Sequence, residues 1–319
     1  MESGQLCESC PTITKMTHKQ RNSLINRVYK ARYIYLALLP CVGMICLFLV
    51  YPALNAIRMS FTNWKMTSYY SPKFVGIDNY ITVLKDGIFW KSMLNLLIFI
   101  GWGFLSTMLW MVPITYLVYR LGAGRLGRFF QRAYVIPMMV PGMVVTLFWR
   151  FFYEPNFGML NNVLKMLGAP KSLYTFVWLG EKSSAIPALL FMGFPWISGF
   201  GFLIVLAGFQ GVDASLHESA MIDGAKATSI FARIDMPLIL PQLKLLIILG
   251  MIGGIQQYTN QMIMTNGGPN YATYVPGLLM YNTAFTYQKL GQGSALGVIL
   301  FILIMAFTVF ANTKIKRVD

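Results

Sequence analysis

The sequence has few charged residues. Asp, Glu, Lys and Arg make up 12% of its 319 residues, whereas 56% are hydrophobic, and soluble globular proteins average about a quarter charged. Acidic residues are scarcest, with 11 Asp and Glu against 26 Lys and Arg, a formal net charge of +15. The basic residues stand mainly at the ends of apolar runs, which is typical of membrane topology and not of nucleic-acid binding. The composition therefore predicts an all-α protein that crosses a membrane several times.

Residues for catalysis are also scarce. The two histidines are His18 and His217, and the sequence lacks a GxxxxGK[ST] phosphate-binding loop. Neither histidine belongs to a recognisable set of nucleophile, base and orienting group, and no metal-ligand spacing is present. We expect no catalytic residue, no bound metal and no cofactor. ATP hydrolysis, if it drives this protein, would take place on another polypeptide that binds ATP and Mg.

The sequence has only four cysteines. Cys7 and Cys10 form a CxxC pair, but a second pair or suitably spaced histidines would be needed for a zinc site, so a reduced cytoplasmic tail is the better interpretation. Cys41 and Cys46 stand inside an apolar run and are expected to be buried as small hydrophobic side chains.

Six apolar runs are long enough to cross a bilayer, and they are residues 33–59, 92–119, 133–152, 183–207, 243–264 and 293–313. They predict a six-helix transmembrane domain, 33–313, between a basic cytoplasmic tail, 1–32, and a short cytoplasmic tail, 314–319. Most Lys and Arg then fall on the side of both termini, as the positive-inside rule requires. No cleavable signal and no internal repeat is evident. Segments 61–91, 154–168 and 265–289 are expected to be outer loops, with short interfacial helices in the first and an amphipathic helix in the second.

One polar segment, residues 215–241, lies between the fourth and fifth runs. Ser215 followed by Glu218 predicts a capping box that opens a short helix. Gly224 is expected to end that helix, because glycine tolerates a left-handed conformation. A second helix is expected to start between Ala225 and Thr228 and to run to Met236, where Pro237 stops it. Local chemistry alone is consistent with a helical hairpin that merely joins two spans.

The spacing of specified positions in this segment is more informative. It resembles the cytoplasmic EAA loop of ABC-importer permeases of the carbohydrate-uptake branch, which includes maltose and glycerol-phosphate permeases. The matching positions are Glu218, Ser219, Ala220, Asp223, Gly224, Ala225, Phe231, Ile234, Pro237 and Pro241. The segments 74–84, 158–168 and 265–269 also resemble this family, so the likeness extends over residues 33–317.

The resemblance implies a type I importer permease whose coupling loop, 208–242, carries a coupling helix that docks on a cytoplasmic ATPase. It implies alternating access in the bacterial inner membrane, two ATPase copies, a second homologous permease that completes a heterodimer, and an extracytoplasmic solute-binding protein. The chain itself would not be an enzyme. The residues implied in ATPase coupling are Glu218, Ser219, Ala220, Met221, Asp223, Gly224 and Ala225.

Polar and aromatic groups at membrane depth are the candidates for contact with a sugar. Gln256 and Asn260, four residues apart, are expected to share a helix face. The alternative is that the amides bond between helices and that the tryptophans are interfacial anchors. Arg150, near the outer boundary, together with the basic charge balance, favours an acidic sugar such as a uronate oligomer, and glycerol-phosphate-type substrates remain open. The candidates are Asn95, Trp149, Arg150, Trp196, Gln256, Gln257, Tyr258 and Asn260.

Two other classes of protein remain as alternatives. An ion-coupled transporter usually places ionisable groups inside the membrane, and only Arg150 comes close. A membrane scaffold subunit without transport would have a well-packed bundle with no solvent-accessible cavity.

Overall fold

The computed structural model describes residues 31–68 and 72–314. Most of the predicted tails, including Cys7, Cys10 and His18, lies outside these residues. The chain divides into two compact units, residues 1–55 and 56–319, which we describe separately. Helices dominate both units, and the β-structure among the described residues is one isolated bridge between Thr62 and Phe74.

The first unit consists of α2 (Arg32–Ile45), the π-helical turn η1 (Cys46–Val50) and the start of α3 (Tyr51–Ser60). These elements form one apolar helix, Arg32–Ser60, of 29 residues. No residue of α2 is buried, and Cys41 and Cys46 are free and exposed. The prediction that these two cysteines are buried is wrong for the chain alone, because a single helix covers none of its own surface.

The second unit contains the remaining helices. Its first half comprises η2 (Met66–Ser68), α4 (Asp78–Lys85), α5 (Gly87–Ser106), η3 (Thr107–Met111), α6 (Val112–Arg120), α7 (Arg125–Val135), η4 (Ile136–Met139), α8 (Gly142–Phe152), α9 (Met159–Met166), α10 (Lys171–Tyr174) and α11 (Lys182–Phe191). Its second half comprises α12 (Gly199–Gln210), α13 (Ala214–Ile222), α14 (Ala227–Ile230), η5 (Phe231–Asp235), α15 (Met236–Leu238), α16 (Leu240–Gln256), α17 (Thr259–Thr265), α18 (Pro276–Tyr281), η6 (Asn282–Thr286) and α19 (Leu290–Lys314).

Three helices of the described chain are long and apolar enough to cross a membrane alone: Arg32–Ser60, Gly87–Arg120 and Leu290–Thr313. Three pairs of consecutive helices reach that length only together, and they bend by 92° (α7–η4 with α8), 62° (α12 with α13) and 63° (α14–α15 with α16). The described residues therefore provide up to six crossings by length and composition. The predicted all-α, polytopic class is confirmed.

Several predicted boundaries need correction. The second span begins at Gly87 and not near residue 92, because Asp86 caps the helix by accepting a hydrogen bond from the Ile88 amide at 2.8 Å. The third run is no single rod and bends sharply before Pro141, which lacks an amide hydrogen and precedes α8. The fourth and fifth runs are also interrupted, at residues 192–198 and at Gln257–Tyr258.

The predicted outer loop 265–289 is helical over residues 276–286. It contains α18 and η6, and Leu278 and Leu279 of α18 are buried. Proline at the first turn sets the backbone angle for a helix start, and Pro276 occupies that position. Burial then explains why this stretch folds as a helix: Leu278 packs in one cluster with Phe89 of α5 and Leu296 of α19.

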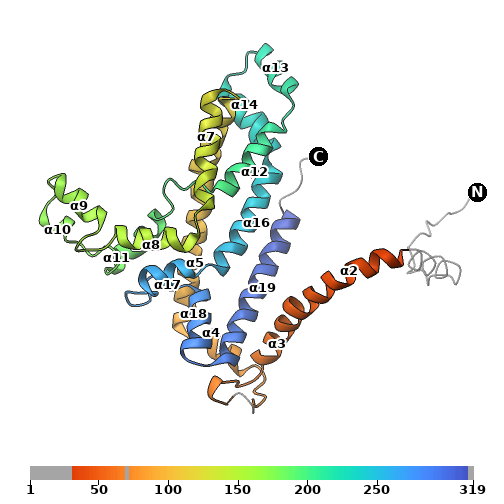
Figure 1. Ribbon diagram of the computed structural model, residues 1–319, viewed down its shortest axis with the longest axis vertical. Coiled ribbons are helices and arrows are strands. Elements are labelled where there is room, and N and C mark those ends of the chain that lie inside the picture. Colours follow the sequence, from red (N-terminus) through yellow and green to blue (C-terminus); the bar gives the residue numbers. More distant parts are fainter. Residues whose placement is uncertain (1–30, 69–71, 315–319) are drawn as a thin grey trace, which may run out of the picture. The chain divides into compact units, whose positions relative to one another are not determined.

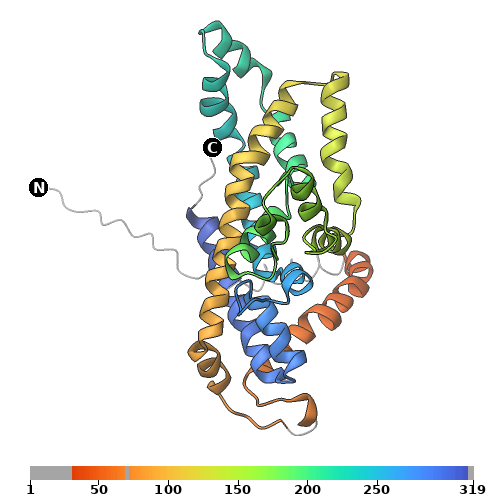
Figure 2. The same cartoon turned by 90° about the vertical axis from the view of Figure 1, so that its left-hand side faces the viewer.

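Packing joins the long helices along the axis of the second unit. α5, α18 and α19 share one apolar cluster, and a second cluster joins Val112 of α6, Val205 of α12 and Leu243 of α16. Figures 1 and 2 show α13 and α14 at one end of this unit and α4 and α18 toward the other. The polar hairpin and the middle of the bundle are therefore separate regions.

Candidate functional site

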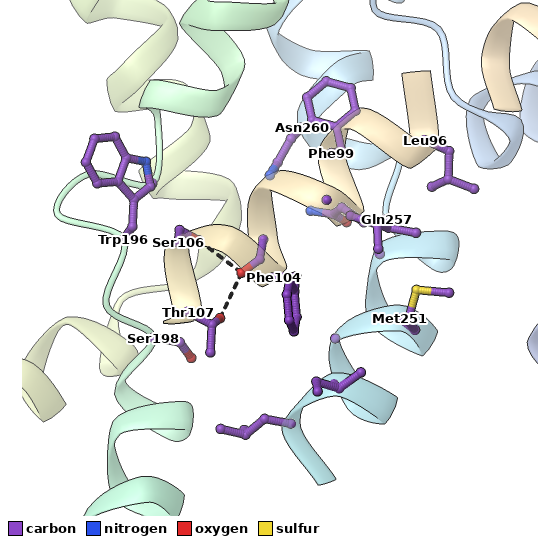
Figure 3. A pocket seen from close by; sticks show the side chains of 18 of the residues that line it. Leu96, Phe99, Phe104, Ser106, Thr107, Trp196, Ser198, Met251, Gln257 and Asn260 are labelled. Atoms are coloured by element: carbon purple, nitrogen blue, oxygen red, sulfur yellow. Dashed lines mark hydrogen bonds between the residues drawn. The ribbon is translucent and has the colours of Figure 1, made fainter. Parts of the chain in front are cut away.

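A cavity of about 790 Å³ lies in the middle of the second unit. Its walls come from α5 and η3, from the irregular segment 192–198, from α16 and from the start of α17 (Figure 3). Side chains and backbone of very different types face it, among them Phe99, Phe104, Ser106, Thr107, Trp196, Ser198, Gly250, Met251, Gln257, Asn260 and Gln261.

The cavity coincides with breaks in the helices. The helix beginning at Gly87 has a π-helical turn at Thr107–Met111, α11 and α12 are separated by residues 192–198, and Gln257 has an extended ψ of 121° between α16 and α17. Irregular backbone at membrane depth is tolerated only where it is buried in protein or faces a water-filled cavity, because lipid cannot satisfy the freed backbone groups. The breaks therefore both make the space and supply polar groups to it.

Trp196 forms an aromatic wall of this cavity. Its backbone φ is 56°, and its indole Nε1 donates a hydrogen bond to the Leu190 carbonyl at 2.8 Å, which spans the interruption between α11 and α12. The ring lies 5.5 Å from that of Trp102 and 5.7 Å from that of Trp110. The Trp102 ring meets it edge-on and the Trp110 ring is tilted against it, and an indole in such a cluster is the type of flat apolar group that packs against a sugar ring.

Three amides, of Gln257, Asn260 and Gln261, bring polar groups to the lining, and Figure 3 shows Gln257 and Asn260 across from Trp196. Asn260 Oδ1 accepts a hydrogen bond from the Thr146 hydroxyl at 2.8 Å, which leaves its NH₂ group for another partner. Gln257 is exposed and lines the cavity, and Gln261 Oε1 is buried without a hydrogen-bond partner among the described residues. An amide set of this kind can exchange hydrogen bonds with the hydroxyl groups of a ligand.

The hydroxyl groups in the lining form hydrogen bonds with backbone groups three or four residues away. Ser106 and Thr107 both donate to the Gly103 carbonyl, at 3.0 and 2.8 Å, and Ser198 Oγ accepts from the Gly201 amide at 3.3 Å to cap α12. Each oxygen retains an acceptor site. None of the described residues that line the cavity is Asp, Glu, Lys or Arg, so this chain contributes a neutral surface.

Of the eight substrate candidates from the sequence, Trp196, Gln257 and Asn260 line the cavity. Their role stays a prediction, and the same holds for the other five. Asn95 is buried and donates to the carbonyl groups of Tyr271 and Tyr274, at 3.3 and 2.9 Å. The others lie outside the lining: Trp149 packs on Phe152 and Tyr153, Tyr258 stacks on Tyr281, and Arg150 and Gln256 are exposed.

The expectation that Gln256 and Asn260 share a helix face is wrong, because the helix ends at Gln256. The break instead brings Gln257, Asn260 and Gln261 together on the cavity. Gln261, a polar residue of the same predicted span, lines the cavity as well, although the eight candidates do not include it. Ser106, Thr107 and Ser198 carry no signal in the sequence, because many apolar runs contain similar hydroxyl residues.

The second site is the polar hairpin at one end of the unit. Asp213, and not Ser215, caps α13: its Oδ1 accepts from the Ser215 amide at 3.0 Å. This backbone hydrogen bond lowers the pKa of the exposed Asp213 carboxyl. The predicted capping box is therefore wrong, because the helix begins one residue before Ser215 and an aspartate at that junction is an equally good cap.

The predicted end of this helix at Gly224 is confirmed. Gly224 has a φ of +78°, its amide donates to the Met221 carbonyl at 3.0 Å, and the Ala225 amide donates to the Ala220 carbonyl at 2.9 Å. This pair of bonds is a Schellman motif, in which a left-handed residue satisfies the last carbonyl groups of a helix. The spacing of Ala220, Gly224 and Ala225 thus has a direct backbone explanation.

The second arm of the hairpin begins at Ala227, within the predicted range, but ends later than predicted. It continues through η5 and α15 to Leu238. Pro237 does not stop it, because this proline lies in the first turn of α15, where a missing amide hydrogen costs no hydrogen bond. The 63° bend into α16 follows directly afterwards.

The outer surface of the hairpin is apolar and acidic. Met221 and Ile222 are 55% and 86% exposed, and Glu218 and Asp223 are exposed beside them. Ala220 and Ala225 are half-buried. Large exposed apolar side chains at a helix end, with acidic neighbours, form a surface suited to docking on a protein partner.

The helical bundle with a central cavity and a protruding hairpin defines a polytopic membrane permease. Residues 111–317 match the family described as the binding-protein-dependent transport system inner membrane component. The chain belongs to this family.

Similar proteins extend the likeness over most of the chain. It is 31% identical over 272 residues to the diacetylchitobiose uptake system permease protein NgcF of Streptomyces coelicolor, covering 82% of this chain and 76% of that protein. It is 31% identical over 285 residues to the trehalose/maltose transport system permease protein MalF of Thermococcus litoralis, covering 88% and 92%. A bacterial ABC transporter involved in the import of the acidic polysaccharide alginate contains a chain of the same fold, with a TM-score of 0.79, 20% identity and coverage of 93% and 99%.

Proposed function

We propose that this chain is the transmembrane permease subunit of a binding-protein-dependent ABC importer, and that its substrate is a short, neutral oligosaccharide. The observation that carries the proposal is the central cavity, in which the Trp196 wall faces the amides of Gln257, Asn260 and Gln261. An aromatic face opposite hydrogen-bonding amides suits a ligand with apolar ring faces and many hydroxyl groups.

The size of the cavity supports an oligosaccharide. Its volume of about 790 Å³ falls within the range of about 300 to 1,000 Å³ that is usual for small-molecule sites. The named substrates of two relatives, diacetylchitobiose and trehalose/maltose, are disaccharides. Membership of the family supports transport, and these names support the class of substrate.

The neutral lining supports an uncharged sugar over a uronate. Arg150 does not line the cavity, so the argument from Arg150 for an acidic sugar receives no support from its position. A uronate oligomer, or a glycerol-phosphate-type substrate, would need a counter-charge from another subunit, because a buried anion is costly without a partner. The alginate importer shares the fold at an identity too low to indicate a substrate.

The hairpin is the proposed contact with the energy source. We place α13 on the cytoplasmic side with both termini, as the distribution of Lys and Arg favours. Met221 and Ile222 would enter a groove on one of two cytoplasmic ATPase subunits, with Glu218 and Asp223 meeting polar or basic groups at its rim. The ATP and Mg would be bound by those ATPases, and this chain would carry no catalytic group.

Two further partners belong to the proposal. A second, homologous permease would complete the cavity as a heterodimer, and an extracytoplasmic solute-binding protein would deliver the sugar. The neutral lining also counts against an ion-coupled transporter, which needs an ionisable group at its coupling site. The presence of a large cavity counts against a scaffold subunit.

The test is reconstitution of the purified assembly in proteoliposomes with its binding protein. Neutral oligosaccharides, uronate oligomers and glycerol phosphate are compared for stimulation of ATP hydrolysis and for uptake. We expect neutral di- to tetrasaccharides to stimulate both. Stimulation by uronates alone would overturn the neutral assignment, and uptake driven by an ion gradient without ATP would overturn the importer class.

A further inference from the structure

His217 lies at the middle of α13 and is the only buried residue of that helix. It is 8% exposed, whereas Ile222 on the same helix is 86% exposed. Its Nε2 lies 2.7 Å from Oδ1 of Asp235, which is completely buried at the end of η5. With Asp235 ionised, Nε2 is the donor of this hydrogen bond. The bond joins the two arms of the hairpin across 18 residues of sequence.

Few other contacts hold α13 in place. None of the described helices packs extensively on it, and its other side-chain hydrogen bonds join Asp213 to Ser215 and Ser219 to Ser215, within the same turn region. Its two ends are a capped start and the left-handed residue Gly224. The orientation of α13 relative to η5 therefore depends on the bond between His217 and Asp235.

Asp235 also lies beside the end of the second span. Tyr116 of α6 interacts electrostatically with it, and the Tyr116 ring lies 4.5 Å from that of Phe231 and 5.3 Å from that of Phe209. Asp235 Oδ2 and Tyr116 Oη are both buried and form no hydrogen bond of ordinary geometry among the described residues, but the two side chains are close enough to interact with each other. In this arrangement Asp235 Oδ1 binds His217 of α13, while Asp235 Oδ2 remains for the side of α6.

We propose that His217 and Asp235 are positioning residues that transmit movement of α13 to η5 and hence to α16, which lines the cavity. This inference rests on the proposed function, because it assumes that α13 docks on an ATPase. A hydrogen bond between buried groups is directional and stiff compared with apolar packing. A shift of α13 then displaces Asp235 and the start of the fifth span, and does not simply bend the hairpin at Gly224.

The first experiment measures coupling in the complete transporter, reconstituted in proteoliposomes with its ATPase, second permease and binding protein. His217→Ala and Asp235→Ala are compared with His217→Gln, whose amide nitrogen can replace Nε2 as a donor. Thr228→Ala, at an exposed position of α14, is the control. We expect uptake per ATP hydrolysed to fall about 10-fold in both alanine variants, which corresponds to loss of one strong hydrogen bond. His217→Gln should keep uptake per ATP hydrolysed close to that of the wild type. In the double alanine variant, this ratio should be no lower than in the more impaired of the two single variants.

The outcomes separate this inference from the proposed function. If the wild type takes up no sugar with ATP, the proposed function fails and the inference fails with it. If the wild type is coupled and the alanine variants assemble with unchanged uptake per ATP, only the inference is overturned. A failure of His217→Gln to restore coupling would also overturn it, because a role for the hydrogen bond predicts rescue.

A spectroscopic measurement tests the same inference independently of transport. Spin labels at Leu216→Cys and Leu245→Cys, in a chain whose native cysteines are replaced, report the distance between α13 and α16 by double electron–electron resonance. We expect His217→Ala to broaden the distance distribution in the assembled transporter and His217→Gln to restore it. Equal distributions in all three proteins would overturn the positioning role, even if the alanine variant were less stable.

Discussion

The cavity and the hairpin are opposite kinds of site. The cavity lies inside the bundle, depends on interrupted helices from four parts of the chain and has a lining without charge among the described residues. The hairpin lies at one end of the unit and consists of consecutive residues, most of them exposed, with His217, Ile230 and Asp235 as the buried ones among residues 213–238. The cavity is thus a product of packing, whereas the hairpin is a product of local backbone chemistry.

The difference explains why the two sites respond differently to substitution. In the hairpin, a backbone angle or a cap decides the structure, so changes act through the geometry of a few residues. In the cavity, space and hydrogen-bonding capacity decide binding, so changes act through the size and polarity of the lining. The following variants test this contrast, each with a matched partner.

The largest effect is expected at Gly224. Proline requires a φ near −65° and cannot adopt the +78° found here, so Gly224→Pro should abolish the Schellman motif. We expect loss of uptake by about 100-fold or more, with membrane insertion retained, because no apolar span changes. Uptake and ATP hydrolysis in proteoliposomes measure the result. Gly122→Pro, at a φ of +63° outside both sites, is the control for strain alone, and full transport by Gly224→Pro would contradict a role for the hairpin.

The next effect is expected at Gly250, which faces the cavity. A Cβ at Gly250 meets no atom within 4 Å, and the same holds for Gly253 of the same helix, which does not line the cavity. Gly250→Leu should fill the cavity and lower uptake about 10-fold or more, more for longer sugars than for shorter ones. Gly253→Leu should have little effect. Equal uptake by the two variants for every sugar length would show that this cavity is not the sugar passage.

Gln257 and Gln256 form a third matched pair. Both are exposed on the break after α16, but only Gln257 lines the cavity. Gln257→Leu should weaken substrate-stimulated ATP hydrolysis about 10-fold through the loss of one hydrogen bond to the sugar, whereas Gln256→Leu should not. A similar loss in both variants would indicate a structural role for this break.

The smallest effect is expected from the helix cap. Hydrogen bonding lowers the pKa of Asp213 in the folded protein below its unfolded value, so its stabilisation of α13 is present above the unfolded pKa of about 4 and is lost as the pH falls through the folded pKa. Hydrogen exchange of the α13 amides should therefore accelerate on acidification relative to Asp213→Asn, which caps without titrating. Asp213→Ala should exchange about 3-fold faster or more at every pH. Equal behaviour of wild type and Asp213→Asn across the acid range would contradict this assignment.

Much of the fold was predictable from the sequence, because long apolar runs and basic flanks have direct physical consequences. The end of α13 at Gly224 was also predictable, because glycine readily adopts the positive φ that ends a helix. The start of α13 was assigned to Ser215 because two neighbouring residues can both cap a helix, and only the backbone shows which does. The burial of residues 276–279 was not predictable, because the tyrosines of the surrounding stretch, Tyr271, Tyr274, Tyr281 and Tyr287, are equally typical of an exposed interfacial loop.

The class of protein, the approximate positions of its spans and the hairpin motif follow from the order of the amino acids, since each depends on residues that are near one another in the chain. The positions of the helix breaks, the choice of amides that face the cavity and the pairing of His217 with Asp235 emerge only in the folded chain. These features depend on contacts between distant segments, and residue spacing carries no information about such contacts. Thus Gln256 and Gln257, identical and adjacent, differ in whether they line the cavity.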